Sequence, residues 1–433
     1  MVIASIDLQK GRVVQLRQGA ELVLQRDNAP ELAEEFGRYG EVAVIDLDAA
    51  MGAGSNFEML RGLLRKAECR VGGGIRSPEQ AKELISLGAV KVIVGSTAFR
   101  DPAVKGKFAL NFPFLEEISG KIGRERLIIA VDAKKNPEGA YEIVVDGWKT
   151  PTGLDLFTAA AAVKPYAGEL LFTGVDREGT MAGADLGGVK ELRTALEGGP
   201  ECKITAAGGV STLEEVETLA RLGCDVQLGM ALYTGKIDLA EAFVRSLNWD
   251  KAAGGLLPVI AQSPDGQVLM TGFTDPEALR ETFRRGNLCF HSRTRNRLWM
   301  KGESSGRILK IKRLRADCDR DAVLAVAEPA GPVCHTGAYS CFGVDRRYTW
   351  EYLGSVIAER FRSPRAGSYT ATLDDELVRE KVAEEAEELC GAAGHDDIVW
   401  EAADLLYFTT ALMVRAGVTV EEVLAELERR HKK

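Results

Sequence analysis

The first 247 residues alternate between short apolar runs and longer amphipathic stretches. The apolar runs are rich in β-branched residues and are predicted strands: VAVIDLD (42–48), VKVIVG (90–95), RLIIAVD (126–132) and ELLFTGVD (169–176). Between them lie stretches with helical spacing of apolar positions, such as SPEQAKELISLGA (77–89). Alternation of this kind over about 250 residues is typical of one parallel α/β unit, either a (β/α)8 barrel or a doubly wound sheet.

An internal near-repeat distinguishes between these two folds. Residues 71–99 (VGGGIRSPEQAKELISLGAVKVIVGSTAF) parallel residues 206–233 (AAGGVSTLEEVETLARLGCDVQLGMALY), with one residue deleted late in the second copy. Ser-Ile-Asp (5–7) and Ala-Val-Asp (130–132) occupy matching positions, each at the end of a predicted strand. Two similar halves indicate a barrel assembled from two half-barrels, so we expect a TIM barrel over residues 1–247.

The pattern changes twice after the barrel. Residues 248–257 contain a Gly pair and are predicted to be a linker. Residues 256–343 carry short alternating segments with turns, including a hairpin around Asp265-Gly266, and predict a small α+β domain. Over residues 348–433 the apolar positions have 3.6-residue periodicity, as in ELVREKVAEEAEELCGAA and IVWEAADLLYFTTALMVRAG, which predicts an all-α domain.

Composition and charge exclude several classes of protein. The chain has 433 residues, of which 45% are hydrophobic and 27% charged, with a formal net charge of −9 and a pI of about 5.3. This acidic balance argues against a general binder of nucleic acid or anionic membranes. No apolar run approaches the roughly 20 residues of a membrane span, and the N-terminal stretch lacks the features of a signal peptide. Eight cysteines are too sparse for a disulfide scaffold, so we expect a reducing, cytoplasmic setting.

Glycine-rich turns in the barrel sequence are candidates for binding phosphate. Such turns, followed by helices, offer backbone N–H groups and helix N-termini to anions. The near-repeat places them in both halves, at Gly73, Gly74, Gly95, Ser96, Gly208, Gly209 and Gly229. One such turn alone is more simply explained as a tight connection between strand and helix. A duplicated pair predicts a substrate with a phosphate at each end.

Asp7 and Asp132 are the candidate catalytic residues of the barrel. Each falls at the carboxyl end of a predicted strand, where the active sites of barrel enzymes lie. Two carboxyl groups that face each other across a barrel mouth can serve as acid and base if their environments separate their pKa values. The alternative is that each aspartate caps a helix or belongs to a structural salt bridge.

Several segments of the barrel sequence carry a family signature: SIDLQKGRVVQLRQG, VGGGIRS, DGWKTPTG, FTGVDREGTMAGADL, AAGGVSTLEE and GMALYTGKIDLAEAF. They resemble the histidine-pathway isomerase that acts on ProFAR, over essentially all of residues 1–247. The resemblance implies an Amadori rearrangement, from an aminoaldose to an aminoketose, on a substrate with two phosphates.

The same resemblance implies roles for individual residues. Asp7 would be the base that moves the C2 proton, and Asp132 the acid that opens the ribose ring. Thr173 would assist, and Trp148 would stack on the substrate. The chain departs from the family at Glu178, where the family often has Asp.

Cys318, Cys334 and Cys341 are the candidate metal ligands of the middle domain. Their spacing, C-x15-C-x6-C, lacks the CxxC pair of a structural zinc site, and scattered core cysteines are an alternative. His335 follows Cys334 directly, and acidic residues flank Cys318. Three thiolates would leave a tetrahedral zinc ion with one position for water, which is a catalytic arrangement.

Acidic residues alternate with other residues around Cys318, at Asp317, Asp319 and Asp321. On an extended strand this spacing would put three carboxylates on one face and the thiol on the other. Hard oxygen ligands suit Mg²⁺, so the triplet is a candidate magnesium site. The alternative is a solvated edge strand.

The segments FHSRTRNRLWMKGESSG, LRADCDRDAVL and CHTGAYSCF follow one another in the middle domain. With the cysteine spacing, they resemble phosphoribosyl-AMP cyclohydrolase over roughly residues 256–343. The resemblance implies hydrolytic opening of the adenine ring at C6 by zinc-bound hydroxide, with His335 as general acid or base. It implies phosphate contacts at Arg293, Arg295 and Lys301, each of which could otherwise be a surface cation. In this family the zinc ligands come from two subunits, which implies a homodimer.

Two acidic motifs lie on predicted helices of the last domain and comprise Glu384, Glu385, Glu388, Glu401 and Asp404. Helices packed face to face would gather these carboxylates into a site for Mg²⁺ and a polyphosphate. A solvated acidic face is the alternative. The second motif lies in the apolar run EAADLLYF, where acids call for partners or a metal.

These motifs and GSYTATL (367–373) resemble phosphoribosyl-ATP pyrophosphohydrolase, of the all-α nucleotide pyrophosphohydrolases, over about residues 348–433. The resemblance implies a phosphate contact at Lys381. The chain departs from the family at Phe408, where the family often has His after Leu-Leu-Tyr, and in its short AAGHDD loop.

Together the resemblances predict a trifunctional enzyme of histidine biosynthesis. Its partners would be phosphoribosyl nucleotides, including an ATP derivative, with Zn²⁺ and Mg²⁺ as cofactors and neither nucleic acid nor membrane. It would be a homodimer through the middle and C-terminal domains. One alternative is a bifunctional isomerase and cyclohydrolase whose helical domain is a degenerate dimerisation module. Another is a barrel that also isomerises phosphoribosylanthranilate.

Overall fold

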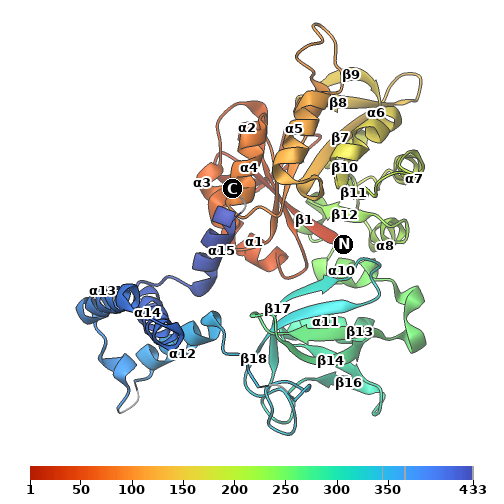
Figure 1. Cartoon of the computed structure of the whole chain (residues 1–433). Helices are drawn as coiled ribbons and strands as arrows, with labels where there is room; N and C mark the ends of the chain where they lie inside the picture. Colours follow the sequence, from red (N-terminus) through yellow and green to blue (C-terminus); the bar gives the residue numbers. More distant parts are fainter. Residues whose placement is uncertain (344, 365–366, 432–433) are drawn as a thin grey trace.

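The first part of the chain forms a closed barrel in a computed structural model, which describes residues 1–343, 345–364 and 367–431 (Figure 1). Eight parallel strands pair in a ring, and β10 pairs with β7 to complete it. In ring order they are β1 (Val2–Gln9), β4 (Val42–Asp46), β5 (Cys69–Gly72), β6 (Lys91–Val94), β7 (Leu127–Lys135), β10 (Glu169–Gly174), β11 (Lys203–Ala207) and β12 (Asp225–Leu228). The predicted (β/α)8 barrel is confirmed, and the doubly wound alternative is wrong.

Helices cover the outside of the ring, and the near-repeat forms equivalent units in the two halves. A capping box begins α4 (Pro78–Ser86) at Ser77 and α8 (Leu213–Arg221) at Thr212. The other barrel helices are α1 (Ala29–Phe36), α2 (Leu47–Met51), α3 (Phe57–Leu63), α5 (Phe112–Ile122), α6 (Leu156–Val163), α7 (Leu186–Ala195), α9 (Met230–Tyr233) and α10 (Leu239–Ser246). Antiparallel strands extend β1 and β7 beyond the ring: β2 (Arg12–Arg17), β3 (Glu21–Arg26), β8 (Tyr141–Val145) and β9 (Thr150–Asp155).

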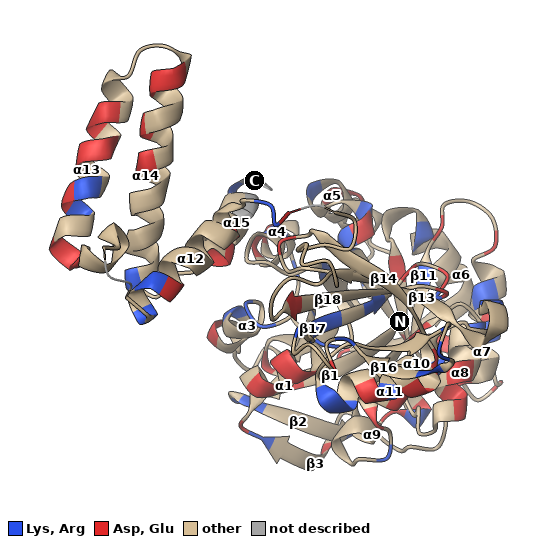
Figure 2. Ribbon diagram, turned by 90° about the horizontal axis from the view of Figure 1, so that it is seen from below, with Lys and Arg blue, Asp and Glu red and all other residues tan. Residues whose placement is uncertain are grey.

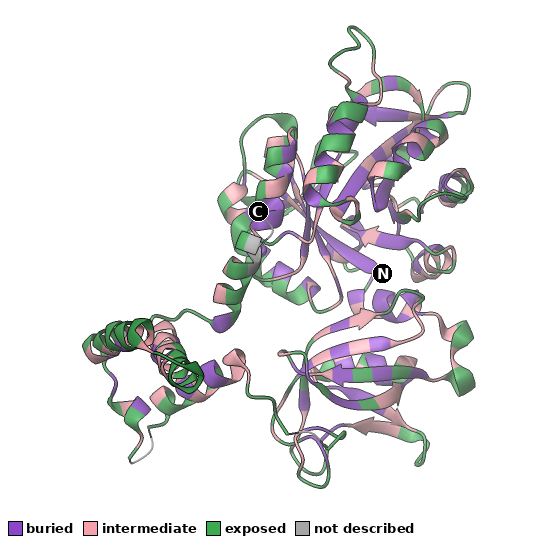
Figure 3. Cartoon of the chain, in the orientation of Figure 1, coloured by how far each residue is buried: buried purple, intermediate pink, exposed green. Residues whose placement is uncertain are grey.

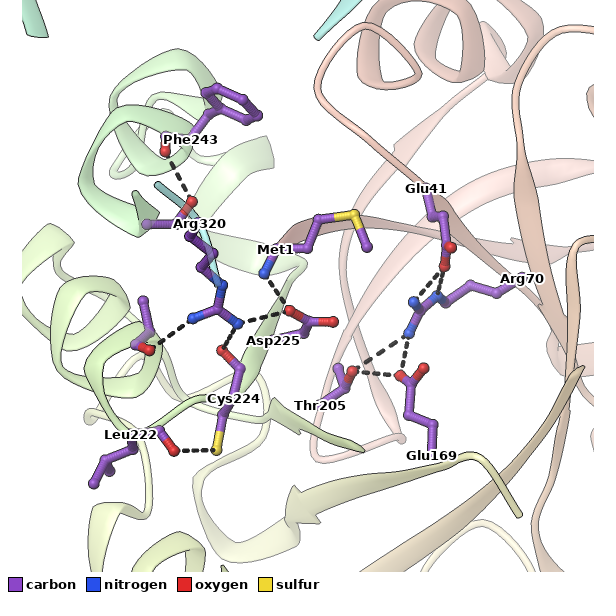
Figure 4. Close-up of polar contacts among 12 residues, drawn as sticks. Met1, Glu41, Arg70, Glu169, Thr205, Leu222, Cys224, Asp225, Phe243 and Arg320 are labelled. Atoms are coloured by element: carbon purple, nitrogen blue, oxygen red, sulfur yellow. Dashed lines mark hydrogen bonds and ion pairs between the residues drawn. The ribbon is translucent and has the colours of Figure 1, made fainter. Parts of the chain in front are cut away.

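The inside of the barrel is closed at the end where the strands begin. Arg70 is fully buried there, and its guanidinium forms ion pairs with Glu41 and Glu169 (Figure 4). Above this charged layer lies an apolar cluster of Ile93, Ile128 and Leu171. The interior is therefore solid up to the carboxyl ends of the strands.

The middle domain is a small α+β unit. Its main sheet has the order β14 (Val268–Thr274), β13 (Leu257–Gln262), β18 (Val323–Pro329) and β17 (Leu309–Ala316). A second pair of strands and one helix complete it: β15 (Cys289–Ser292), β16 (Arg297–Met300) and α11 (Pro276–Arg285). The predicted hairpin around Asp265-Gly266 is confirmed, because β13 and β14 are antiparallel neighbours joined across it.

The barrel and the middle domain share one apolar core. Phe243, Val244 and Leu247, at the end of the barrel, pack in one cluster with residues of β13, β14, β17 and β18. Trp249 packs against this cluster, and its Nε1 donates to the carbonyl of Val244 at 2.9 Å. The predicted linker is therefore held against both domains at its start.

The C-terminal domain is helical, as predicted, and all but its last helix stands apart from the rest of the molecule (Figure 1). It consists of α12 (Trp350–Arg362), α13 (Asp375–Gly391), α14 (His395–Arg415) and α15 (Val420–His431). Helices α13 and α14 pack side by side and are mostly exposed (Figure 3). Helix α15 returns to the barrel and contacts α4.

Within the described part of the chain, no single helix is long and apolar enough to cross a membrane. Helix α14 and Val420–Leu427 pass a test of length and composition only as a pair, bent by 112°.

We expect Arg70→Ala to destabilise the barrel by about 3–5 kcal/mol, because it leaves the carboxylates of Glu41 and Glu169 buried with Lys91 as their one remaining cation among the described residues. Urea denaturation followed by circular dichroism would measure the loss. The matched control is Arg61→Ala, which removes an exposed ion pair 2.8 Å long to Glu58 and should change stability far less. Equal losses for the two variants would contradict a stabilising role of the buried layer.

Candidate active sites

One cavity at the mouth of the barrel, about 300 Å³ in volume, collects the predicted barrel residues. Its lining contains the predicted catalytic residues Asp7, Asp132 and Thr173, together with Trp148. It also contains every predicted phosphate-binding residue of the barrel: Gly73, Gly74, Gly95, Ser96, Gly208, Gly209 and Gly229. The fold brings them together because each lies at or near the carboxyl end of a strand.

The paired glycines of the near-repeat adopt the same backbone conformation in both halves. Gly73 and Gly74 have φ of +100° and +70°, and Gly208 and Gly209 have +92° and +77°. A Cβ at Gly73 would lie 2.2 Å from the carbonyl oxygen of Asp46, so no other residue fits there. Both turns lead into the N-termini of helices, α4 and α8, whose partial positive charge favours anions.

Gln15 is a cavity residue that the sequence pattern did not single out. It is 4% exposed, and its Nε2 has no hydrogen-bond partner within the described residues. Its Oε1 lies 3.0 Å from the position that a Cβ would take at Gly229. An unpaired buried amide is costly, which makes Gln15 a candidate donor to a ligand at this turn.

The two candidate catalytic carboxyl groups have different partners. Ser5 Oγ donates to Asp7 Oδ1 at 2.9 Å, and burial raises the pKa of Asp7 to about 6. Trp148 Nε1 donates to Asp132 Oδ2 at 2.9 Å, and burial raises the pKa of Asp132 against the hydrogen bonds from Thr173 and Trp148. Neither aspartate caps a helix or joins a salt bridge among the residues described. The alternative explanation, that each aspartate only caps a helix or belongs to a structural salt bridge, therefore lacks support.

Glu178 adds a third carboxyl group to the cavity. Burial, and then the charges of Asp7 and Asp132, raise its pKa to about 7. Its Oε2 lies 3.1 Å from the position of a Cβ at Gly208, so that glycine also leaves room for the longer side chain. A carboxyl group that keeps its proton near neutral pH can donate a hydrogen bond.

A second cavity, about 640 Å³ in volume, lies in the middle domain. Its lining includes several predicted residues: Arg295, Lys301, Cys334 and His335. It also includes Arg307, which was not predicted and whose Nη1 donates to the carbonyl of Cys334 at 3.3 Å. Arg293 points elsewhere, with its guanidinium 3.8 Å from the centre of the Phe273 ring.

The three predicted zinc ligands occupy two different places in one chain. Cys334 and Cys341 lie within hydrogen-bonding reach of each other. Cys318 is exposed on the turn after β17 and forms no metal-binding group with them among the residues described. All eight cysteines are free thiols.

The expectation that the aspartate triplet lies on an extended strand is wrong. Strand β17 ends at Ala316, and residues 317–322 form a turn. The reason is local: the Asp317 carboxylate accepts the N–H groups of Asp321 at 3.0 Å and Ala322 at 3.1 Å, which folds the chain back.

The turn nevertheless gathers the three carboxylates. Asp317, Asp319 and Asp321 each offer an oxygen within 4.8 Å of the others. Burial and the charges of its neighbours raise the pKa of Asp317, and the hydrogen bond from Lys251 lowers that of Asp319. Lys251 also pairs with Asp321 at 3.5 Å, so the cluster already attracts a cation.

The acidic motifs of the helical domain meet between α13 and α14 (Figure 2). Glu385 and Glu388 on α13 and Glu401 on α14 offer oxygens within 4.8 Å of one another. Burial, followed by the charges of Glu388 and Asp404, raises the pKa of Glu385. Mutual repulsion of this kind favours a bound cation.

Glu384 lies outside this group and forms an ion pair of 2.6 Å with Lys381. Phe408, the departure noted in the sequence, is buried with its ring edge-on to Tyr369 and Tyr407. Its place in the small core of this domain explains an apolar residue there.

Three family models match the chain, in the order of its domains. The model described as "Histidine biosynthesis protein" matches residues 1–238. Those described as "Phosphoribosyl-AMP cyclohydrolase" and "Phosphoribosyl-ATP pyrophosphohydrolase" match residues 270–343 and 351–431. The three resemblances seen in the motifs are confirmed.

Curated relatives named "Histidine biosynthesis bifunctional protein HisIE" share about half of the chain. That of Escherichia coli strain K12 is 41% identical over 203 residues, 45% of this chain and 99% of that protein. That of Pyrococcus furiosus is 38% identical over 207 residues, with shares of 44% and 99%. That of Xanthomonas campestris pv. campestris is 42% identical over 194 residues, with shares of 43% and 94%. The chain therefore belongs to the histidine biosynthesis protein family, and joins an isomerase barrel of that pathway to cyclohydrolase and pyrophosphohydrolase domains.

Proposed function

We propose that the three domains act in succession on one nucleotide, in the reverse of their order along the chain. Residues 348–433 remove pyrophosphate from phosphoribosyl-ATP, residues 256–343 open the adenine ring of phosphoribosyl-AMP, and residues 1–247 isomerise the product. The barrel cavity carries the proposal, because two half-buried carboxyl groups lie in one cavity with two glycine turns suited to phosphates. The match over residues 351–431 favours three activities over a degenerate helical module.

In the barrel, Asp7 is the base that moves the C2 proton and Asp132 the acid that opens the ribose ring. The hydrogen bond from Trp148 orients the Asp132 carboxyl group, in addition to the stacking expected of that ring. Gly73, Gly74, Gly208, Gly209 and Gly229, with Gly95 and Ser96, bind the two phosphates. Proton transfer by positioned side chains is worth about 10²–10⁴-fold in rate.

We expect the kcat/KM of the isomerase to fall as the pH drops through about 6, because Asp7 must be ionised to act as a base. Ser5→Ala should move this acid limb to higher pH, since the Ser5 hydrogen bond stabilises the charged carboxylate. Rates measured on purified ProFAR across the pH range would test both. An acid limb that Ser5→Ala leaves in place would argue against Asp7 as the titrating base.

In the middle domain, Cys318, Cys334 and Cys341 hold zinc across a homodimer, with Cys318 from one subunit and the other two from its partner. Their thiols fit the metal, and their separation within one chain supports a shared site. Bound zinc would supply a hydroxide at neutral pH. His335 moves a proton at the adenine, and Arg295 and Lys301 bind phosphate.

Exposed apolar side chains on α14 support the same homodimer in the helical domain. Ile398, Val399 and Trp400 are 47%, 55% and 69% exposed on one stretch of this helix. Contact with a second copy would bury them.

Subunit mixing tests the shared zinc site. Neither Cys318→Ser nor Cys334→Ser alone should open the adenine ring, because each removes a ligand from both sites of the dimer. Mixed and refolded together, the two variants should regain about one quarter of the wild-type sites, since each heterodimer keeps one intact site. No recovery in heterodimers that have been shown to form would contradict a site built from two subunits.

In the helical domain, Glu385, Glu388, Glu401 and Asp404 hold Mg²⁺ beside the polyphosphate. The group of Glu385, Glu388 and Glu401, of which Glu385 is buried, fits this hard cation, which would stabilise the charge of the leaving pyrophosphate. Lys381 binds phosphate. Its ion pair with Glu384, one turn further along α13, holds its side chain against this helix.

With phosphoribosyl-ATP as substrate, the wild-type chain should release pyrophosphate and form the aminoketose product. Glu385→Gln should stop pyrophosphate release, because it removes a metal ligand. The matched control, Glu387→Gln, changes an exposed acid on the other side of α13 and should retain release. Equal activity of the two variants would sink the assignment, and accumulation of either intermediate in the wild type would sink the activity of the following domain.

A further inference from the structure

The turn that carries the aspartate cluster, residues 317–322, is anchored in the barrel by Arg320 (Figure 4). The Arg320 side chain is 12% exposed. Its Nη1 donates to the carbonyl of Ala220 at 2.6 Å, and its Nη2 to that of Cys224 at 2.8 Å. The same Nη2 forms an ion pair of 2.9 Å with Asp225, the first residue of β12.

The backbone at this position is held from the opposite side. Arg320 has a φ of +63°, which a long side chain adopts only where its surroundings fix it. Its carbonyl accepts the N–H of Asn248 at 2.8 Å, from the connection between the two domains. Lys251, from the same connection, pairs with Asp319 and Asp321 on either side of Arg320.

The contact that anchors Arg320 in the barrel is an ion pair with Asp225. Burial acts to raise the pKa of Asp225, but the charges of the Met1 amine and of Arg320 hold it at about 2. The carboxylate therefore stays ionised, and the guanidinium makes charge-assisted hydrogen bonds in a partly buried place. A rigid barrel strand thus determines where Arg320 sits.

The aspartates need such an anchor because they repel one another. Asp317, Asp319 and Asp321 lie within 4.8 Å of each other on a turn with exposed members. Repulsion, which Lys251 offsets only in part, and chain entropy both favour opening of the turn when no metal ion is bound. Fixing the residue at its centre offsets these costs in advance of binding.

We propose that Arg320 is a positioning residue through which the barrel holds the aspartate carboxylates in the geometry that binds a divalent cation of the cyclohydrolase domain. The proposal rests on the Mg²⁺ role expected of this cluster. One end of the barrel then carries the isomerase cavity, and the other end supports a second active site.

The test compares two interdomain ion pairs in the full-length, zinc-loaded protein. Arg320→Ala removes the anchor of the turn. Arg280→Ala is the matched control, because Arg280 links α11 to the barrel through Glu241 and, among the described residues, forms no hydrogen bond or ion pair with the turn. For Arg320→Ala we expect the half-saturating Mg²⁺ concentration of ring opening to rise about tenfold, with kcat restored at excess Mg²⁺.

Two further readouts separate positioning from general damage. Hydrogen exchange at the Asp321 and Ala322 amides, without added Mg²⁺, should be faster in Arg320→Ala than in Arg280→Ala. Asp225→Asn, a change made wholly within the barrel, should raise the Mg²⁺ requirement of the cyclohydrolase in the same direction. Isomerase activity, measured in parallel, reports that the barrel is intact.

Failure of the positioning role and failure of the Mg²⁺ role would give different results. Unchanged exchange and an unchanged Mg²⁺ requirement in Arg320→Ala would overturn the positioning role, and so would a loss of kcat that excess Mg²⁺ does not restore. A wild-type cyclohydrolase that needs no Mg²⁺ would instead overturn the metal role of the cluster, whatever the exchange rates of the turn.

Discussion

All eight strands of the barrel run in the same direction, and the arrangement of the whole molecule depends on this constraint. The strand ends that carry Asp7, Asp132 and the glycine turns must all meet at one mouth. The strand beginnings meet at the other, where Arg70 closes the interior with buried ion pairs. The middle domain packs on that closed end, where its Arg313, Arg315 and Arg320 pair with Glu68 and Asp225 of the barrel.

The barrel cavity and the two acidic clusters each gather carboxyl groups of like charge. Burial raises the pKa of Asp7, Asp132 and Glu178, so each carboxyl group is more stable protonated than it is in an unfolded chain. The stability that these groups contribute is present at low pH and is lost as the pH rises through their raised pKa values. Near neutral pH the cavity at the barrel mouth therefore lowers the stability of the fold.

The sequence could predict what local pattern determines. The near-repeat implied the half-barrels, and positive φ at Gly73 and Gly208 explains why glycine recurs there. Contacts between residues far apart along the chain produce no local pattern in the sequence and could not be predicted in this way. In the sequence, Gln15 resembles any inward-facing residue of a strand, and Arg320 resembles any arginine of a loop. Their roles become visible only in the fold, which places Gln15 beside Gly229 and Arg320 beside Asp225.

At residues 317–322, hydrogen bonds to a side chain determined the backbone conformation, and the strand expected from the alternating acids did not form. The Asp317 carboxylate competes for backbone N–H groups and turns the chain where the spacing of the acids had indicated a strand. The cysteines Cys318, Cys334 and Cys341 could be named from the sequence as candidate zinc ligands, but their separation within one chain could not, because the spacing of cysteines along a sequence does not determine where the fold places them.

Helix α10 has two buried faces. Leu239 and Ala242 belong to the core of the barrel, and Phe243 and Val244 to that of the middle domain. A cut after residue 247 would therefore strip the barrel of the surface that covers its last helix, and leave the middle domain with an open core. In this chain the isomerase barrel and the cyclohydrolase domain depend on one shared apolar cluster, although their chemistry divides them into two enzymes.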